Sequence, residues 1–361
     1  QQQRLEIIKA LYRGADLLIL DEPTAVLTPQ EVEELFIMIR QLTGEGHTVI
    51  FISHKLNEVM EISQRVTVLR AGRSEATVET KDTSKEELAR LMVGRDVFLR
   101  FDKKECCPKE TVLEMQKVES LNNKGLKALK ELSLEVKAGE VLAIAGVDGN
   151  GQSELVEAIT GLRPVISGKV LLNGKDMTNK HPREILEEKI AHIPEDRHRR
   201  GLVMNMSIKE NLMLMNYYKE PFAKGIMVDW DFIEKHSEDL VEQYNVKTPG
   251  IDVKAKNLSG GNQQKVILGR EIYREPNLLI AMHPTRGLDI GATEYVHKRI
   301  IQERDRGCAV LLVSTELEEV LSLSDRIAVL YEGEVMGILE NKNVDIEELG
   351  LMMAGSKKIA S

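Results

Sequence analysis

The sequence contains a long internal repeat. Residues 3–94 and 264–355 align without a gap, at a constant offset of 261 residues. A period of this length indicates a duplicated domain and not the short units of a solenoid. The matched pairs run along both copies and include Gln3 with Gln264, Tyr12 with Tyr273, Arg13 with Arg274, Pro23 with Pro284, Ser53 with Ser314, Glu58 with Glu319 and Gly94 with Gly355. We therefore expect both copies to share one fold.

Three charged or protonatable residues break the repeat. Asp21, Glu22 and His54 in the first copy are replaced by Met282, His283 and Thr315 in the second. Each acid alone could merely cap a turn, and a lone histidine after a strand is usually an ordinary surface residue. Their joint loss indicates one chemical task that only the first copy retains.

Short apolar runs at 17–20, 48–53 and 141–145 predict strands that are buried on both faces of a parallel sheet. Helices are predicted between the strands, at 1–15, 29–43 and 55–63, and Ser84 is predicted to cap another. A Met-rich helical lobe is predicted over 205–245. Alternating strands and helices define an α/β fold with a mostly parallel sheet.

We predict three segments: a domain over 1–95, a linker over 96–110, which is charged and aperiodic, and a second domain over 111–361. The second copy is preceded by residues 111–263, whereas the first is preceded by almost nothing. We therefore expect the first domain to be incomplete, with an N-terminal stretch of similar length missing.

Composition narrows the function classes. The net charge of −9 and the 42% apolar content describe a soluble, acidic protein. An acidic surface repels phosphates, so no nucleic-acid partner is expected. No apolar run reaches the roughly 18 residues that span a bilayer. Three cysteines, with Cys106 and Cys107 adjacent, predict free thiols and not a disulfide framework.

A glycine-rich loop follows the predicted strand 141–145 and opens a helix. Such a loop lets backbone N–H groups converge on a phosphate at the positive end of the helix. Ser153 stands where a hydroxyl would bind Mg²⁺, but Gln152 stands where a lysine is usual and brings no charge. The alternative is a plain glycine turn. The predicted nucleotide ligands here are Gly146, Gly149, Asn150, Gly151, Gln152, Ser153 and Glu154.

Two further segments carry chemistry. Asp21 and Glu22 end a strand, where one carboxylate can hold Mg²⁺ and the next can polarise an attacking water. Residues 258–265, LSGGNQQK, precede a helix and present a hydroxyl and bare amides at its N-terminus. The predicted ligands of this second anion cradle are Ser259, Gly260, Gly261 and Gln263.

These strings together resemble the ATP-binding cassette (ABC) proteins. LLILDEPT (17–24), LSGGNQQK (258–265) and GVDGNGQSE (146–154) carry the resemblance to the family, and IPEDRHRRGL (193–202) and PTRGLD (284–289) narrow it to the double-cassette ATPase subunits of simple-sugar importers. AGVDGNGQSELVEAITGL (145–162) is most similar to the branch that serves nucleoside importers with BMP-family lipoprotein receptors. The resemblance implies a P-loop NTPase fold with a helical subdomain, in tandem cassettes of which the first is incomplete.

The resemblance assigns a role to each segment. It makes Asp21 a metal ligand, Glu22 the catalytic base and His54 a switch histidine. It makes residues 146–154 the Walker A loop of the second cassette and 258–264 its signature. It places Asp289 in the loop that joins two cassettes and Glu195 in the usual place of a glutamine. The segment 197–201 then lies near the permease, although a solvated basic face is an equal alternative.

The resemblance implies ATP and Mg²⁺ as cofactors and head-to-tail pairing of cassettes, with one competent and one degenerate site. The expected function is an ATPase that energises import of nucleosides or simple sugars. It would lie peripherally on the cytoplasmic membrane face, with transmembrane permease subunits as partners and a receptor lipoprotein reached indirectly. The chain alone is expected to be weakly active or inactive, because the first Walker A loop is missing. The alternatives are a soluble tandem-cassette ATPase acting on ribosomes or nucleic acid, and a binding module only.

Overall fold

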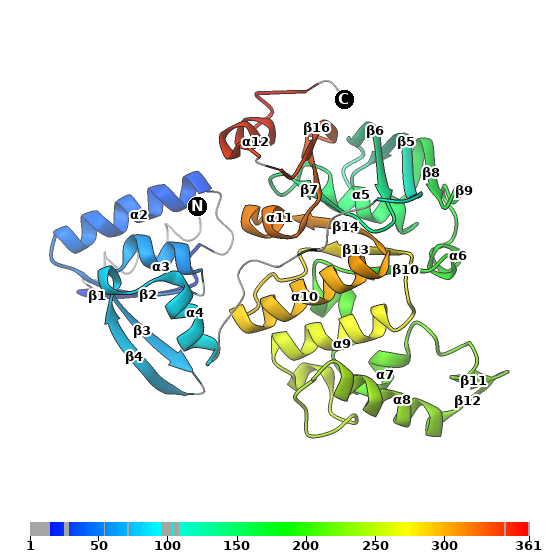
Figure 1. The fold of residues 1–361 in the computed structure, drawn as a ribbon, viewed down its shortest axis with the longest axis horizontal. Helices are drawn as coiled ribbons and strands as arrows, with labels where there is room; N and C mark the ends of the chain where they lie inside the picture. Colours follow the sequence, from blue (N-terminus) through cyan, green and yellow to red (C-terminus); the bar gives the residue numbers. More distant parts are fainter. Residues whose placement is uncertain are drawn as a thin grey trace. The chain divides into compact units, whose positions relative to one another are not determined.

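The computed structural model describes residues 15–24, 29–53, 55–70, 72–94, 103, 108–342 and 344–359 (Figure 1). The chain divides into two compact units, Gln1–Leu99 with Asp289–Glu294, and Arg100–Leu288 with Tyr295–Ser361. Nearly all of the predicted helix at 1–15 and most of the predicted linker at 96–110 lie outside the described residues. Among the residues that are described, no helix is both long and apolar enough to cross a membrane.

The first unit alternates strands and helices as predicted. Its elements are β1 (Leu17–Asp21), α2 (Pro29–Gly44), β2 (Thr48–Ile52), α3 (Leu56–Ile62), β3 (Arg65–Arg70), β4 (Arg73–Glu79), the 3₁₀ turn η1 (Thr80–Asp82) and α4 (Lys85–Val93). β1 and β2 pair in parallel, and β3 and β4 pair antiparallel. The predicted cap of α4 is confirmed, because the Ser84 hydroxyl accepts a hydrogen bond from the amide of Glu87 at 3.2 Å.

The prediction that β1 is buried on both faces is wrong. Leu18 is 4% exposed, but its neighbours Leu17 and Ile19 are 49% and 62% exposed. Leu18 packs against Phe36 of α2 and its neighbours in a small core. In the described residues β1 pairs only with β2, so the face that carries Leu17 and Ile19 remains open to solvent.

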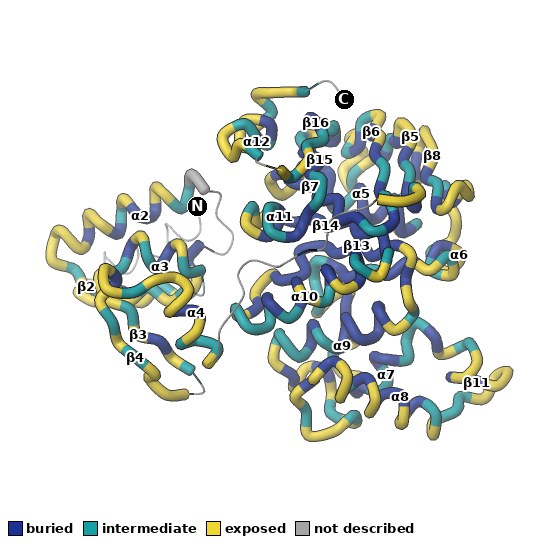
Figure 2. The backbone as a smooth tube through the Cα atoms, viewed as in Figure 1, coloured by how far each residue is buried: buried dark blue, intermediate teal, exposed yellow. Residues whose placement is uncertain are grey.

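The second unit is built on a six-stranded sheet in the order β10-β13-β14-β7-β15-β16. These strands are β7 (Val141–Ala145), β10 (Ile190–Ile193), β13 (Leu278–Met282), β14 (Ala309–Ser314), β15 (Arg326–Tyr331) and β16 (Glu334–Glu340). All neighbours pair in parallel except β15 and β16. Every residue of β7, β13 and β14 is buried, and Figure 2 shows β7 and β14 in the buried colour. The predicted parallel α/β core is confirmed here.

A second, antiparallel sheet in the order β6-β5-β8-β9 was not predicted. Its strands are β5 (Thr111–Leu121), β6 (Lys127–Lys137), β8 (Val165–Leu172) and β9 (Lys175–Asp176). The helices and turns of this unit are α5 (Gln152–Ile159), α6 (Pro182–Glu187), the π-turn η2 (Arg197–Gly201), α7 (Ile208–Met213), α8 (Trp230–Gln243), the 3₁₀ turn η3 (Ala255–Asn257), α9 (Gly260–Ile272), α10 (Ile290–Arg306), α11 (Leu317–Leu323) and α12 (Ile346–Met353).

The predicted helical lobe at 205–245 contains α7, α8 and a short hairpin of β11 (Ala223–Lys224) and β12 (Met227–Val228). Figure 1 shows this lobe at one end of the second unit, with β5, β6 and β8 at the other and the parallel sheet between them. The phosphate loop, residues 146–154, follows the end of β7 and runs into the first turn of α5. The sheet therefore fixes the direction in which this loop leaves the core.

The two copies of the repeat share fine detail. The β3–β4 hairpin has a register shift between Val68 and Leu69, and the β15–β16 hairpin has one between Val329 and Leu330, at the same offset of 261 residues. A bulge re-aims a strand and is a built feature of a fold. The gapless alignment therefore reflects a shared backbone and not only a shared pattern of residues.

Candidate nucleotide site

The backbone of the phosphate loop requires its glycines. Gly149 and Gly151 have φ of 91° and 107°, which side chains rarely tolerate. A Cβ on Gly151 would lie 2.7 Å from the carbonyl oxygen of Ala128 on β6. Gly151 then precedes α5, which begins at Gln152. Left-handed glycines before a helix turn backbone N–H groups toward one point, as an anion requires.

Gln152 closes the loop on itself. Its amide nitrogen donates to the Val147 carbonyl at 2.9 Å, and its amide oxygen accepts from the Asn150 N–H at 3.0 Å. The side chain is only 5% exposed. A lysine in this place would carry a charge toward a phosphate, whereas Gln152 satisfies groups of the loop itself. The loop therefore keeps its shape without supplying the charge.

Asn150 holds the loop against the turn between β15 and β16. Its side-chain oxygen accepts from the Glu332 N–H at 2.9 Å, and its carbonyl accepts from the Gly333 N–H at 2.9 Å. Its side-chain nitrogen donates to the Val147 carbonyl at 3.0 Å. Contact of Asn150 with a nucleotide stays a prediction, and its side chain positions the loop. Ser153 and Glu154 lie half-buried in the first turn of α5.

His283 faces the phosphate loop from the end of β13. Its Nε2 lies 3.8 Å from Asp148 Oδ1, and its side chain is almost fully buried. Burial lowers the pKa of His283, and the charge of Asp148 opposes that shift only in part. The imidazole is therefore mostly neutral near pH 7. Met282 stands where the first copy has Asp21, so this strand end has lost its metal-binding carboxylate. The neutral imidazole of His283 cannot replace it.

Asp21 and Glu22 occupy the corresponding position in the first unit. Asp21 is the last residue of β1, and both side chains are exposed. His54, the third predicted member of this group, lies outside the described residues. A carboxylate and a serine hydroxyl are both hard oxygen donors, so Asp21 in the first unit and Ser153 in the second each suit a separate Mg²⁺, which takes few protein ligands and completes its shell with phosphates and water. No cluster of three or more His, Cys, Asp or Glu side chains that could hold a metal by itself occurs in the described ranges.

A buried threonine–glutamate bond supports the strand end in both copies. The Thr24 hydroxyl donates to Glu58 at 2.6 Å, and the Thr285 hydroxyl donates to Glu319 at 2.7 Å. Sequence reasoning missed a further partner in the second copy, His297, whose Nε2 lies 2.8 Å from Glu319. Burial alone would raise the pKa of Glu319, but the hydrogen bond from His297 and those of its neighbours outweigh burial and lower it. The alignment of the two copies could have pointed to this histidine, because His297 aligns with the apolar Phe36 of the first copy.

The signature segment, residues 258–264, is rigidly held. Gln263 is 3% exposed and donates to the carbonyls of Ala255 and Leu258 at 3.1 and 3.2 Å. Nucleotide binding by Gln263 stays a prediction, and its side chain fixes the turn before α9. Ser259 is exposed, and its hydroxyl accepts from the Asn262 side chain at 3.0 Å. Ser259 and the half-buried Gly260 and Gly261 thus stand at the N-terminus of α9.

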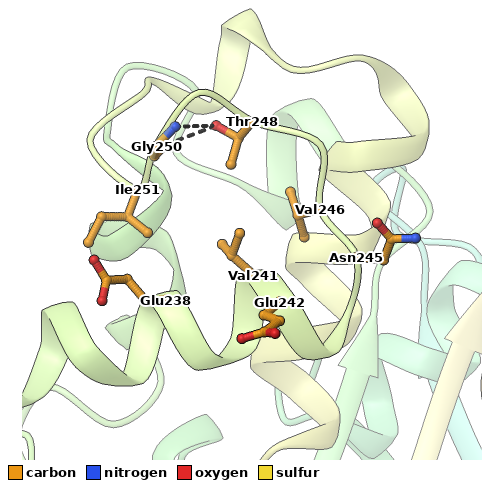
Figure 3. Close-up of a pocket in the computed structure, with 8 residues that line it drawn as sticks. All are labelled: Glu238, Val241, Glu242, Asn245, Val246, Thr248, Gly250 and Ile251. Atoms are coloured by element: carbon orange, nitrogen blue, oxygen red, sulfur yellow. Dashed lines mark hydrogen bonds between the residues drawn. The ribbon is translucent and has the colours of Figure 1, made fainter.

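A pocket of about 350 Å³ lies elsewhere, between α8 and the loop that follows it (Figure 3). The apolar side chains of Val241, Val246 and Ile251 line it together with the carboxylates of Glu238 and Glu242. Two carboxylates repel a phosphate. The pocket contains none of the predicted site residues and does not suit a nucleotide.

A mostly parallel sheet with a phosphate loop after a buried strand, and a helical lobe carrying an LSGG segment, defines the class of ATP-binding cassette ATPases. Residues 129–286 match the family model described as ABC transporter. The chain also superposes on the crystal structure of a nucleotide-free ATP-binding cassette from an ABC transporter with a TM-score of 0.56. That match covers 68% of this chain and 96% of the other at 24% identity, and it shows the fold.

Two curated relatives match almost the whole chain. The chain is 51% identical over 355 residues to the nucleoside import ATP-binding protein NupA of Lactococcus lactis subsp. cremoris, covering 98% of this chain and 70% of that protein. It is 52% identical over 356 residues to the guanosine import ATP-binding protein NupO of Bacillus subtilis, with the same coverage. The chain belongs to the family of ATP-binding subunits of ABC transporters. It spans about 70% of the length of these relatives.

Proposed function

We propose that the chain is the ATP-hydrolysing subunit of an ABC importer for nucleosides. The observation that carries the proposal is the identity of 51% and 52% to nucleoside and guanosine import subunits over nearly the whole chain. Simple sugars are the alternative cargo, because the double-cassette type also serves sugar importers. The partners are transmembrane permease subunits, so the protein would lie at the cytoplasmic face of the membrane.

The proposed organisation is two unequal cassettes, over residues 1–95 and 111–361, joined by the linker 96–110. The competent site combines Asp21, Glu22 and His54 with the signature amides of an opposed cassette. The degenerate site contains the phosphate loop of the second cassette. What supports the inequality is the chemistry at the two strand ends, where Glu22 is replaced by His283 and Asp21 by Met282.

In the competent site each residue has a defined task. Asp21 would hold Mg²⁺, and Glu22 would orient and polarise the attacking water. Ser259, Gly260 and Gly261 would donate hydrogen bonds to the terminal phosphate from the N-terminus of α9. When bound, Mg·ATP supplies the reactive phosphoryl group and the charge that these residues stabilise. In the degenerate site Ser153 remains, but no carboxylate follows β13, so nucleotide binding without efficient hydrolysis is expected.

Uptake in cells with and without the gene tests the proposal. Loss of the gene should abolish uptake of labelled guanosine and leave uptake of ribose unchanged, and the wild-type gene should restore guanosine uptake. Loss of ribose uptake alone would show that the importer carries simple sugars and not nucleosides. If the protein sediments with ribosomes and not with membranes that contain the permease, the transport function itself is wrong.

A further inference from the structure

The ring of His283 reaches the phosphate loop but makes no hydrogen bond to its carboxylate. Every residue of β13 is buried, and His283 directly follows the last of them, Met282. Its Nε2 lies 3.8 Å from Asp148 Oδ1, a separation that is too long for a hydrogen bond. His283 is only 7% exposed, so bulk water reaches little of the ring. The ring therefore keeps a donor for another acceptor at the loop.

The phosphate loop supplies backbone amides but no positive charge. The charged side chains of residues 146–154 are both acidic, Asp148 and Glu154. Gln152, where a lysine is usual, bonds to the backbone of Val147 and Asn150 within the loop. A phosphate in this loop therefore needs a cation from another element, and His283 faces the loop from the end of β13.

The charged surroundings of His283 leave room for an anion. Four charged groups face the ring from separate segments: Asp148 in the phosphate loop, Glu195 after β10, Arg286 after β13 and Glu319 in α11. Glu195 is paired with Arg286 at 2.8 Å, and Glu319 is hydrogen-bonded to its own buried partners. Asp148 has a side chain that is 61% exposed, so it can turn to solvent when a phosphate takes its place beside the ring.

A bound phosphate would change the protonation of His283. Burial lowers the pKa of His283 below its usual value in the free chain. An anionic phosphate beside the ring favours the charged imidazolium, so the pKa rises in the complex. Binding then takes up a proton from solvent, which goes to the ring nitrogen that is unprotonated in the free chain. The affinity is therefore greatest below the pKa of the free chain and falls as the pH rises through the pKa of the complex.

We propose that His283 is a nucleotide-binding residue of the second cassette, whose ring donates to the terminal phosphate of Mg·ATP and takes up a proton as it does so. His283 aligns with Glu22, the proposed base, whose task places it beside that phosphate. The exchange of glutamate for histidine thus removes a base and adds a phosphate ligand, which favours retention of ATP over hydrolysis. The inference rests on the proposed function, because it requires nucleotide to bind the phosphate loop.

Equilibrium binding of Mg·ATP and Mg·ADP to the 361-residue chain, between about pH 6 and pH 8, tests the inference. The proteins compared are the wild type, His283→Gln and His236→Gln, because glutamine keeps a donor but cannot take up a proton. His236 is the matched control. It is also 7% exposed, burial lowers its pKa too, and it packs in the helical lobe against Phe232 and Tyr273. Thermal melting of each variant reports any general loss of stability.

At the acidic end of the range, His283→Gln should bind Mg·ATP about fivefold more weakly than the wild type, and the difference should shrink as the pH rises. Comparing the two proteins cancels the titration of the nucleotide itself. Mg·ADP, which lacks the terminal phosphate, should bind both equally, and His236→Gln should match the wild type throughout. Equal affinity of the wild type and His283→Gln for Mg·ATP would overturn the inference, as would an equal loss for Mg·ADP or in His236→Gln.

Calorimetry of the wild type alone covers the case in which His283→Gln does not fold. Heats of binding in buffers of different ionisation enthalpy give the number of protons taken up. Near pH 7, Mg·ATP should take up more protons than Mg·ADP, by a fraction of one proton, and equal uptake would contradict the role of His283. If the wild type binds neither nucleotide, nucleotide binding at the phosphate loop is wrong and the inference fails with it, whereas binding that does not depend on His283 rejects the inference alone.

Discussion

Glu22 and His283 have the same strained backbone at the end of equivalent strands. Each has φ of 43°, and the N–H of each donates across the sheet, Glu22 to the Ile52 carbonyl at 2.9 Å and His283 to the Val313 carbonyl at 2.8 Å. A left-handed conformation costs a residue with a side chain on the order of 1–2 kcal/mol. The second copy has kept the backbone of this position and changed the side chain from the proposed catalytic glutamate to histidine. At this strand end the two copies therefore differ in side-chain chemistry and not in backbone conformation.

Glu22→Gln should reduce ATP turnover in the assembled transporter by at least a hundredfold, because glutamine cannot polarise the attacking water. Each tenfold corresponds to about 1.4 kcal/mol of barrier. His283→Glu in the same protein should restore little activity, because Met282 still lacks the metal-binding carboxylate. Steady-state phosphate release measures both variants. A loss of less than tenfold in Glu22→Gln would count against its role as the base.

Gln152→Lys should strengthen ATP binding to the second phosphate loop severalfold without raising turnover. The substitution adds a positive charge beside the phosphates, and a charge-assisted hydrogen bond is roughly twice as strong as a neutral one. Hydrolysis should not follow, because His283 and Met282 remain. Equilibrium binding of labelled ATP to the isolated chain measures the effect. Unchanged affinity would mean that the loop binds no phosphate near residue 152.

Gly151→Ala should destabilise the second unit by about 2–4 kcal/mol, because it combines an unfavourable φ with a collision against the Ala128 carbonyl. Gly174→Ala is the control, since Gly174 has φ of 76° but no atom within 4 Å of an added Cβ. It should cost only about 1–2 kcal/mol, the cost of the left-handed backbone alone. Urea unfolding separates the two values. Equal losses would show that the close approach to β6 does not constrain the loop.

His192 should make folding pH-dependent. Burial lowers its pKa from 6.5 to about 4, and its Nε2 has no hydrogen-bond partner. The unfolded chain therefore binds a proton that the folded chain rejects between pH 6.5 and 4. Stability contributed by neutral His192 is present above pH 6.5, falls as the pH falls, and has lost about 3 kcal/mol by pH 4.

Replacing His192 with leucine removes the titrating group and keeps an apolar residue in β10. Urea unfolding of the wild type and His192→Leu between pH 4 and 7 should show a shallower slope for the variant. Parallel slopes would mean that the imidazole takes up its proton in the folded chain as readily as in the unfolded chain.

The sequence predicted the elements with strong local signals. The buried strand 141–145, the glycine loop after it and the Ser84 cap each depend on a few adjacent residues, and all three occur as expected. The apolar run 17–20 predicted a strand correctly, but periodicity cannot tell which neighbours will cover its faces. The exposure of Ile19 depends on the partners of β1, and these are not encoded in its own residues.

The sequence also could not predict which way the side chains within a motif point. Gln152, Asn150 and Gln263 stay predicted as nucleotide ligands, and the motif gave no sign of the hydrogen bonds by which each side chain holds its own loop. A sequence motif specifies which residue stands at a position, but it does not specify the direction of that residue's side-chain amide. Similarly, the sequence left open whether residues 197–201 lie near the permease or form a solvated basic face, and it did not predict bonds within the chain. Only the tertiary structure shows Arg197 donating to the Arg286 carbonyl and Arg200 paired with Glu157.

Single-turnover hydrolysis in the assembled transporter tests the central claim, that the two sites differ in chemistry, most directly. Complexes loaded with labelled Mg·ATP and then separated from free nucleotide should hydrolyse roughly half of the bound ATP quickly and retain the other half. Glu22→Gln complexes should hydrolyse almost none. Rapid hydrolysis of all the bound ATP at one rate would contradict the account.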